Sequence, residues 1–178
     1  VAPWQIGVLT GLFKSAKTID DIADGEETIR ILRDLTANAR GMIPATSLPL
    51  SQRIDAVRLL GCAPVFNGAP DLDLLARQLS PSTPPALRGA LFETLSRTRH
   101  PGTAKALLAR WHSLPPTDRA TVLNLISSRT SWSEDLLSAI ESDGLPRNQV
   151  DAATRRKLVE SSDESIRENA EALFDSAS

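Results

Sequence analysis

The stretch LLARQ, from Leu74 to Gln78, recurs 33 residues later as LLARW, from Leu107 to Trp111. A third copy, LLSAI, begins 29 residues further on at Leu136 and ends at Ile140, and a looser echo, ALF, occupies residues 172–174. One other apolar stripe separates successive copies. The repeated unit is therefore predicted to be a pair of antiparallel helices, roughly 30 to 37 residues long.

Apolar residues spaced three and four apart continue this pattern along the chain, as expected for one-sided helices of about three turns. The stripes are Trp4, Val8 and Leu12, widened by Ile6, Leu9 and Phe13; Ile29, Leu32 and Leu35; Ile54, Val57 and Leu60; Leu72, Leu75 and Leu79; Leu87, Leu91 and Leu95; Ala104, Leu108 and His112; Val122, Leu125 and Ile126; Trp132, Leu136 and Ile140; Val150, Thr154 and Leu158; and Ile166, Ala170 and Phe174. The twelve prolines lie outside the middles of these stripes. Capping-box spacing at 24–27 and 131–134 predicts two helix starts.

The predicted fold class is therefore all-α, because sustained apolar and polar alternation is absent. Such helix pairs cannot bury both faces alone, so they stack into a right-handed α-α superhelix of the HEAT/armadillo type, with about five pairs. We expect one domain, 1–178, with pairs at 1–40, 50–80, 84–113, 116–143 and 147–176. The predicted core residues of the repeats are Leu75, Leu108, Trp111, Trp132, Leu137, Ile140, Ile166 and Phe174. Tetratricopeptide repeats have a similar period, but their Trp, Gly-Tyr and Ala-Phe pattern is missing.

Composition excludes several classes of function. Twenty basic and 22 acidic residues give a net charge of -2, which argues against a nucleic-acid partner. No apolar run approaches the roughly 18 residues of a membrane span, so no membrane insertion is expected. Cys62 is the single cysteine, which excludes an internal disulfide, a cysteine-based zinc site and c-type haem attachment.

Catalytic, cofactor and metal residues are not predicted. His100 precedes Pro101-Gly102 and is expected in a solvated loop, while His112 is expected to complement a helix C-terminus. Cys62 is expected to be a small buried apolar residue. The carboxylates, such as Asp71 and Asp73, are placed at helix starts or on outward faces. The chain is therefore interpreted as a non-catalytic interaction or spacer module.

Arginines cluster at 97–129 and at 147–167, where they are expected chiefly to bond an aspartate or a carbonyl of the next repeat. A docking surface for an acidic partner is the alternative. Trp111 and Trp132 are assigned to the core. If the solenoid curves as usual, polar residues on the second helix of each pair line its concave side. The predicted docking face consists of Arg77, Lys105, Arg110 and Glu141.

The stretch from about 84 to 175 carries a further pattern, including LARW (108–111), SSRTSW (127–132) and LLSAIE (136–141). It continues with Asp151, Arg155-Arg156 and IRE (166–168). This order resembles the helical-repeat region of planctomycete-type haem-binding proteins, the putative membrane-bound dehydrogenase family. The resemblance implies an exported, periplasmic or membrane-associated parent with a sugar-dehydrogenase-like propeller, HEAT repeats and a cytochrome c domain.

In that interpretation the chain is excised from a longer protein and spaces the propeller from the cytochrome domain. Its partners are those flanking domains, or another protein, and haem c belongs to the parent outside this chain. A free-standing HEAT adaptor for a protein or peptide is the alternative. A HEAT-like DNA glycosylase is a third hypothesis, which the low content of basic residues disfavours.

Overall fold

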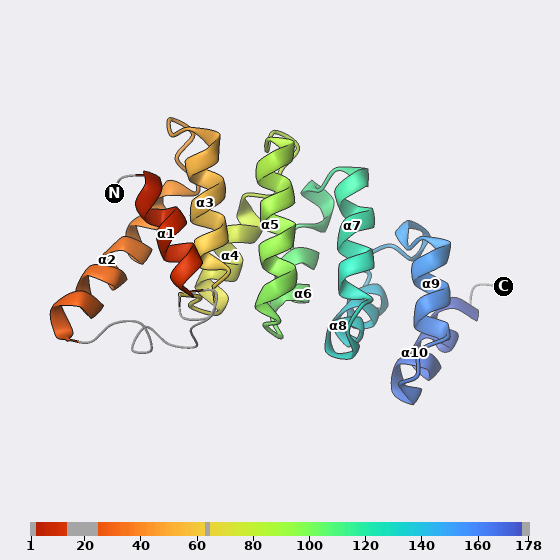
Figure 1. The fold of residues 1–178 in the computed structure, drawn as a ribbon. Coiled ribbons are helices and arrows are strands. Elements are labelled where there is room, and N and C mark those ends of the chain that lie inside the picture. Colours follow the sequence, from red (N-terminus) through yellow and green to blue (C-terminus); the bar gives the residue numbers. More distant parts are fainter. Residues whose placement is uncertain (1–2, 14–24, 63–64, 176–178) are drawn as a thin grey trace. The chain divides into compact units, whose positions relative to one another are not determined.

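The computed structural model describes residues 3–13, 25–62 and 65–175, and the predicted cap Asp24 and the side chain of Trp4 lie outside the part it describes. Helices cover these residues and no strand occurs among them, which confirms the all-α prediction. The helices are α1 (Pro3–Phe13), α2 (Glu26–Met42), α3 (Leu50–Leu60), α4 (Ala69–Arg77), α5 (Pro85–Thr98), α6 (Thr103–Leu108), α7 (Pro116–Ile126), α8 (Thr130–Glu141), α9 (Ala152–Val159) and α10 (Glu164–Asp175), with 3-10 turns η1 (Trp111–Ser113) and η2 (Arg147–Gln149) (Figure 1).

The chain divides into two compact units, Val1–His100 and Pro101–Ser178. The boundary falls between α5 and α6, inside the predicted helix pair 84–113. Each unit is a two-layer helical body with a core of its own.

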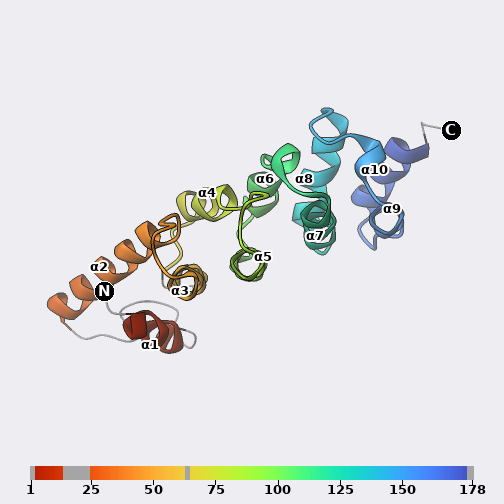
Figure 2. The same cartoon turned by 90° about the horizontal axis from the view of Figure 1, so that it is seen from above.

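In unit 1, α3 packs against α1, α2 and α5, while α4 packs against α5. Viewed from above, α1, α3 and α5 form one row and α2 and α4 form another (Figure 2). Leucines of α3, α4 and α5, together with Leu79 shortly after α4, form much of the core of this unit. Those fully buried are Leu59, Leu60, Leu75, Leu79, Leu87, Leu91 and Leu95.

Helix α1 turns a different face to the core from the one its first stripe predicts. Ile6, Leu9 and Phe13 are buried, whereas Val8 and Leu12 are 53% and 48% exposed. Nearly every residue of this helix is apolar, so the sequence contains no polar face to fix its orientation. The contact with α3 decides which side is buried.

A buried ion pair connects α2 to the start of α4. Asp71, predicted at a helix start or on an outward face, lies in the first turn of α4. It is 1% exposed and accepts hydrogen bonds from Arg40 Nε (2.7 Å) and Nη2 (2.8 Å). The Asn67 amide donates to the same carboxylate at 2.7 Å. Arg40 also donates to the carbonyls of Val65 and Thr36. The carboxylate is therefore fully partnered, as a buried charge requires.

In unit 2, α8 packs against α6, α7 and α10, and α9 packs against α10. Within this unit α6, α8 and α10 form one row in Figure 2. Six of the eight predicted core residues are buried in their own units, namely Leu75, Trp111, Trp132, Leu137, Ile140 and Ile166. Leu108 and Phe174 are half-exposed, and their neighbours Leu107 and Leu173 are buried instead. Ala104 of α6 and Ile166 and Ala170 of α10 are buried as their stripes predict, so the difference begins toward the C-terminal end of each stripe.

A recurring arginine stands four residues after the N-cap of each first helix from α3 onward, at Arg53, Arg88, Arg119 and Arg155. Each guanidinium donates to a carbonyl in the segment that leads into its own helix, at Ile43, Thr83, Trp111 and Val150 respectively. The predicted arginine–carbonyl bonds therefore form within a corner, whereas we expected them to reach the next repeat. Among the described residues, no backbone amide donates to the carbonyls of Ile43, Thr83 and Val150, so these arginines satisfy them, whereas the Trp111 carbonyl also accepts from the Leu114 amide.

A side-chain network ties η1 to η2 in unit 2. Trp111 Nε1 donates to Gln149 Oε1 at 2.6 Å, and Arg119 Nη1 donates to the same oxygen at 3.2 Å. The Arg119 guanidinium also lies 5.6 Å from the centre of the Trp111 ring. The indole N–H, buried in the core, thus has the partner that a buried tryptophan needs.

Two helix starts differ in their capping. Asp151 Oδ1 caps α9 by accepting from the Thr154 amide at 2.8 Å. The predicted capping box at 131–134 is wrong, because α8 begins at Thr130 and Arg129 holds the capping position with no side-chain hydrogen bond.

None of the helices within the described residues is long and apolar enough to cross a membrane.

Candidate functional site

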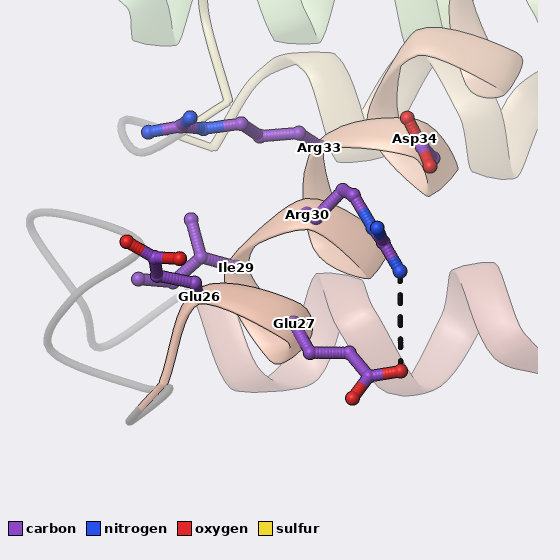
Figure 3. Close-up of a pocket in the computed structure, with 6 residues that line it drawn as sticks. All are labelled: Glu26, Glu27, Ile29, Arg30, Arg33 and Asp34. Atoms are coloured by element: carbon purple, nitrogen blue, oxygen red, sulfur yellow. Dashed lines mark ion pairs between the residues drawn. The ribbon is translucent and has the colours of Figure 1, made fainter.

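A hollow with a volume of about 830 Å³ lies beside the first half of α2. Its described lining residues all belong to this one helix, and Figure 3 shows the ion pair between Glu27 and Arg30. That pair is 3.9 Å long and both partners are largely exposed. Two acidic residues are followed by two basic ones and then by Asp34, and their side chains point in different directions (Figure 3). The hollow therefore lacks the arrangement of a binding site.

A groove between α6 and α8 in unit 2 is the better candidate. Its volume is about 350 Å³, and Lys105, Leu108, Ala109, Asp135, Ser138, Ala139, Ser142 and Gly144 line it. We call it the α6–α8 groove. On each helix the lining residues are spaced three and four apart, so they share one face.

The α6–α8 groove combines one ion pair with small side chains. Lys105 Nζ lies 3.6 Å from Asp135 Oδ1, and the Asp135 side chain is only 19% exposed. Leu108 is half-exposed because it lies along this groove, which accounts for its absence from the core. Alanine, serine and glycine on the α8 side leave room for an incoming side chain. The groove can thus receive an apolar group beside an ion pair whose carboxylate is largely buried.

Three of the four predicted docking residues, Lys105, Arg110 and Glu141, belong to unit 2. Lys105 is the one of the four that lines the α6–α8 groove. Arg77 belongs to unit 1, where it is exposed and paired with Asp73 on its own helix. Arg110 is half-buried beside η1, and Glu141 is exposed at the end of α8.

Sequence reasoning missed Asp135 and the small residues of α8. Their signal is the spacing 135, 138, 139 and 142, which places them on one face of the helix. Exposed alanines and serines are common on helices, however, so this spacing alone does not distinguish a groove from ordinary surface.

The remaining candidates for chemistry take structural positions. Cys62 is buried, as predicted. His100, predicted in a solvated loop, is half-buried with its ring 6.0 Å from that of Phe66 in an edge-on contact. His112 is exposed in η1. Within the described residues, no three His, Cys, Asp or Glu side chains are grouped closely enough to hold a metal ion.

Comparisons with protein families, curated proteins and solved structures give no match to this chain.

Proposed function

We propose that this chain is a non-catalytic scaffold of the HEAT/armadillo type that docks a protein partner in the α6–α8 groove. The packing of helices within each unit supports this proposal, as do the arginines that recur at successive corners. Stacked pairs of this kind provide extended binding surfaces. The observation that carries the proposal is the ion pair between exposed Lys105 and largely buried Asp135, beside half-exposed Leu108.

The occupant we propose is an adjoining domain of the same polypeptide. The family resemblance supports an exported parent in which the chain spaces a sugar-dehydrogenase-like propeller from a cytochrome c domain. Haem c would be held by the cytochrome domain. This chain does not fit the cofactor itself, because its single cysteine, Cys62, is buried and c-type attachment uses two.

The first test is to sequence the parent gene on both sides of this chain. A Cys-x-x-Cys-His motif downstream and a strand-rich domain upstream are expected. The neighbouring domains are then produced separately and titrated against this chain by calorimetry. Neighbours of another kind, or none, would refute the spacing role and favour the free-standing adaptor.

A pair of tryptophan variants tests the groove. Ser138→Trp fills the α6–α8 groove and is expected to weaken binding of the neighbouring domain by about tenfold or more, as for loss of one central contact. Asn124→Trp places the same side chain on an exposed position of α7 and is the matched control. Equal affinity of the two variants would show that the partner binds elsewhere.

A further inference from the structure

Helix α1 has an exposed side made only of apolar residues and glycine. Val8 and Leu12, one turn apart, are 53% and 48% exposed, and Gly7 and Gly11 beside them are exposed as well. Among the residues of α1 whose burial the structure describes, these four are the exposed ones. They are spaced three and four apart, so they share one side of the helix, which we call the α1 face.

The α1 face differs from the exposed sides of the other described helices. Each of those exposes at least one polar or charged side chain, such as Arg58 on α3, Glu93 on α5 and Lys157 on α9. No residue of α1 is charged. In Figure 2, α1 stands at the end of the row that it forms with α3 and α5. A helix that is apolar on every side is normally buried on every side, so the α1 face is suited to cover by another helix.

The shape and charge of the α1 face suit a second copy of the same face. Val8 and Leu12 form a ridge, and Gly7 and Gly11 form a groove beside it, where an added Cβ would meet nothing within 4 Å. Two such helices related by a two-fold axis can each place their ridge in the groove of the other. No like charges meet there, because α1 has none, and the net charge of the whole chain is only -2.

We propose that this chain forms a symmetric dimer in which the α1 faces of two copies pack against each other. Val8 and Leu12 of each copy would be buried over Gly7 and Gly11 of the other. A contact made by one 11-residue helix from each copy is smaller than a stable interface, so we expect a weak dimer with a Kd of about 0.1 mM. The proposal is independent of the α6–α8 groove, which belongs to unit 2.

Sedimentation equilibrium of the full chain tests the proposal. Protein concentrations should extend from about tenfold below to about tenfold above the expected Kd. We expect a reversible equilibrium of monomer and dimer without larger species, because a two-fold contact occupies the α1 face of both copies. A chain that stays monomeric at every concentration would overturn the proposal and would leave the α1 face to a helix of another protein.

Two glutamate variants test where the copies meet. Leu12→Glu places two carboxylates in the contact, one from each copy, and is expected to weaken dimerisation by more than about tenfold. Ile31→Glu is the matched control, because Ile31 is also 48% exposed but lies on α2, and it is expected to leave dimerisation unchanged. Equal weakening by the two variants would show that the copies do not meet at the α1 face.

Two alanine variants separate dimerisation from folding. Gly7→Ala fills the groove and is expected to weaken dimerisation by about tenfold. The same change is expected to raise the melting temperature of the monomer, measured well below the Kd, because alanine favours a helix more than glycine does. Gly89→Ala on α5 is the control, since Gly89 is also exposed with nothing near an added Cβ. It is expected to raise the melting temperature without changing dimerisation. Unchanged dimerisation of Gly7→Ala, or a lower melting temperature for it, would contradict the proposed contact.

Discussion

Replacing Arg40 with methionine is expected to destabilise unit 1 more than replacing its partner Asp71 with alanine. The two side chains of the pair are unequally buried, with the carboxylate 2% exposed and the guanidinium 27% exposed. Removing Arg40 leaves a carboxylate inside the protein with one remaining donor, the Asn67 amide. Removing Asp71 leaves a guanidinium that still reaches solvent and two carbonyl oxygens.

The expected magnitudes follow from this asymmetry. Breaking a buried ion pair costs about 3–5 kcal/mol, and we expect about 3 kcal/mol for Arg40→Met because water can enter beside the partly exposed site. Asp71→Ala is expected to cost about 2 kcal/mol, as for loss of hydrogen bonds to a charged group. The double variant Arg40→Met with Asp71→Leu replaces both charges by apolar groups and is expected to recover most of the loss.

Urea unfolding followed by circular dichroism measures these differences, and hydrogen exchange of α2 and α4 locates them. Exchange is needed because two compact units need not unfold in one transition. Arg77→Met is the control, since it breaks an exposed pair within α4 and is expected to change stability by less than about 1 kcal/mol. The reasoning is refuted if Asp71→Ala is the more damaging single change, or if the double variant loses the sum of both.

Three further changes are expected to act within unit 2. Gln149→Ala leaves the buried Trp111 indole N–H without its acceptor and is expected to lower the free energy of unfolding by about 1–3 kcal/mol, measured by thermal unfolding. An unchanged melting temperature would contradict the network. Asp151→Ala removes the cap of α9 and is expected to cost about 1 kcal/mol in urea, against no change for Asp151→Asn, a residue that also caps. Leu107→Ala is expected to lower the free energy of unfolding by about 2–5 kcal/mol, and Leu108→Ala by clearly less, because Leu107 is the buried residue of the two. A larger loss for Leu108→Ala would contradict this assignment and favour the stripe predicted from the sequence.

The spacing of apolar residues predicts the helices well because each helix buries one stripe against its neighbours. Where a residue borders a groove, as Leu108 does, hydropathy cannot tell partial from full burial. In α1 apolar residues lie on every side of the helix, so Val8 and Ile6 carry the same signal although their burial differs. The packing of one helix on another decides these cases.

Less of the candidate site than of the fold could be predicted from the sequence. Lys105 was predicted from its polarity, whereas its partner Asp135 is 30 residues away and meets it only because α6 packs on α8. The residue pattern at the start of α8 also led to a wrong prediction of where the helix begins. Ser131 and Glu134 have capping-box spacing, yet the helix starts one residue before Ser131 and leaves Arg129 at the cap.

The arginines at the helix corners have a consequence for how the protein is made. Arg53, Arg88, Arg119 and Arg155 each bond a carbonyl five to ten residues earlier in the chain. Loops of about ten residues close within roughly 10–100 ns, far faster than a ribosome adds one amino acid. Each corner can therefore form as soon as its arginine leaves the exit tunnel. The nascent chain would present preformed bends onto which later helices pack in order of synthesis.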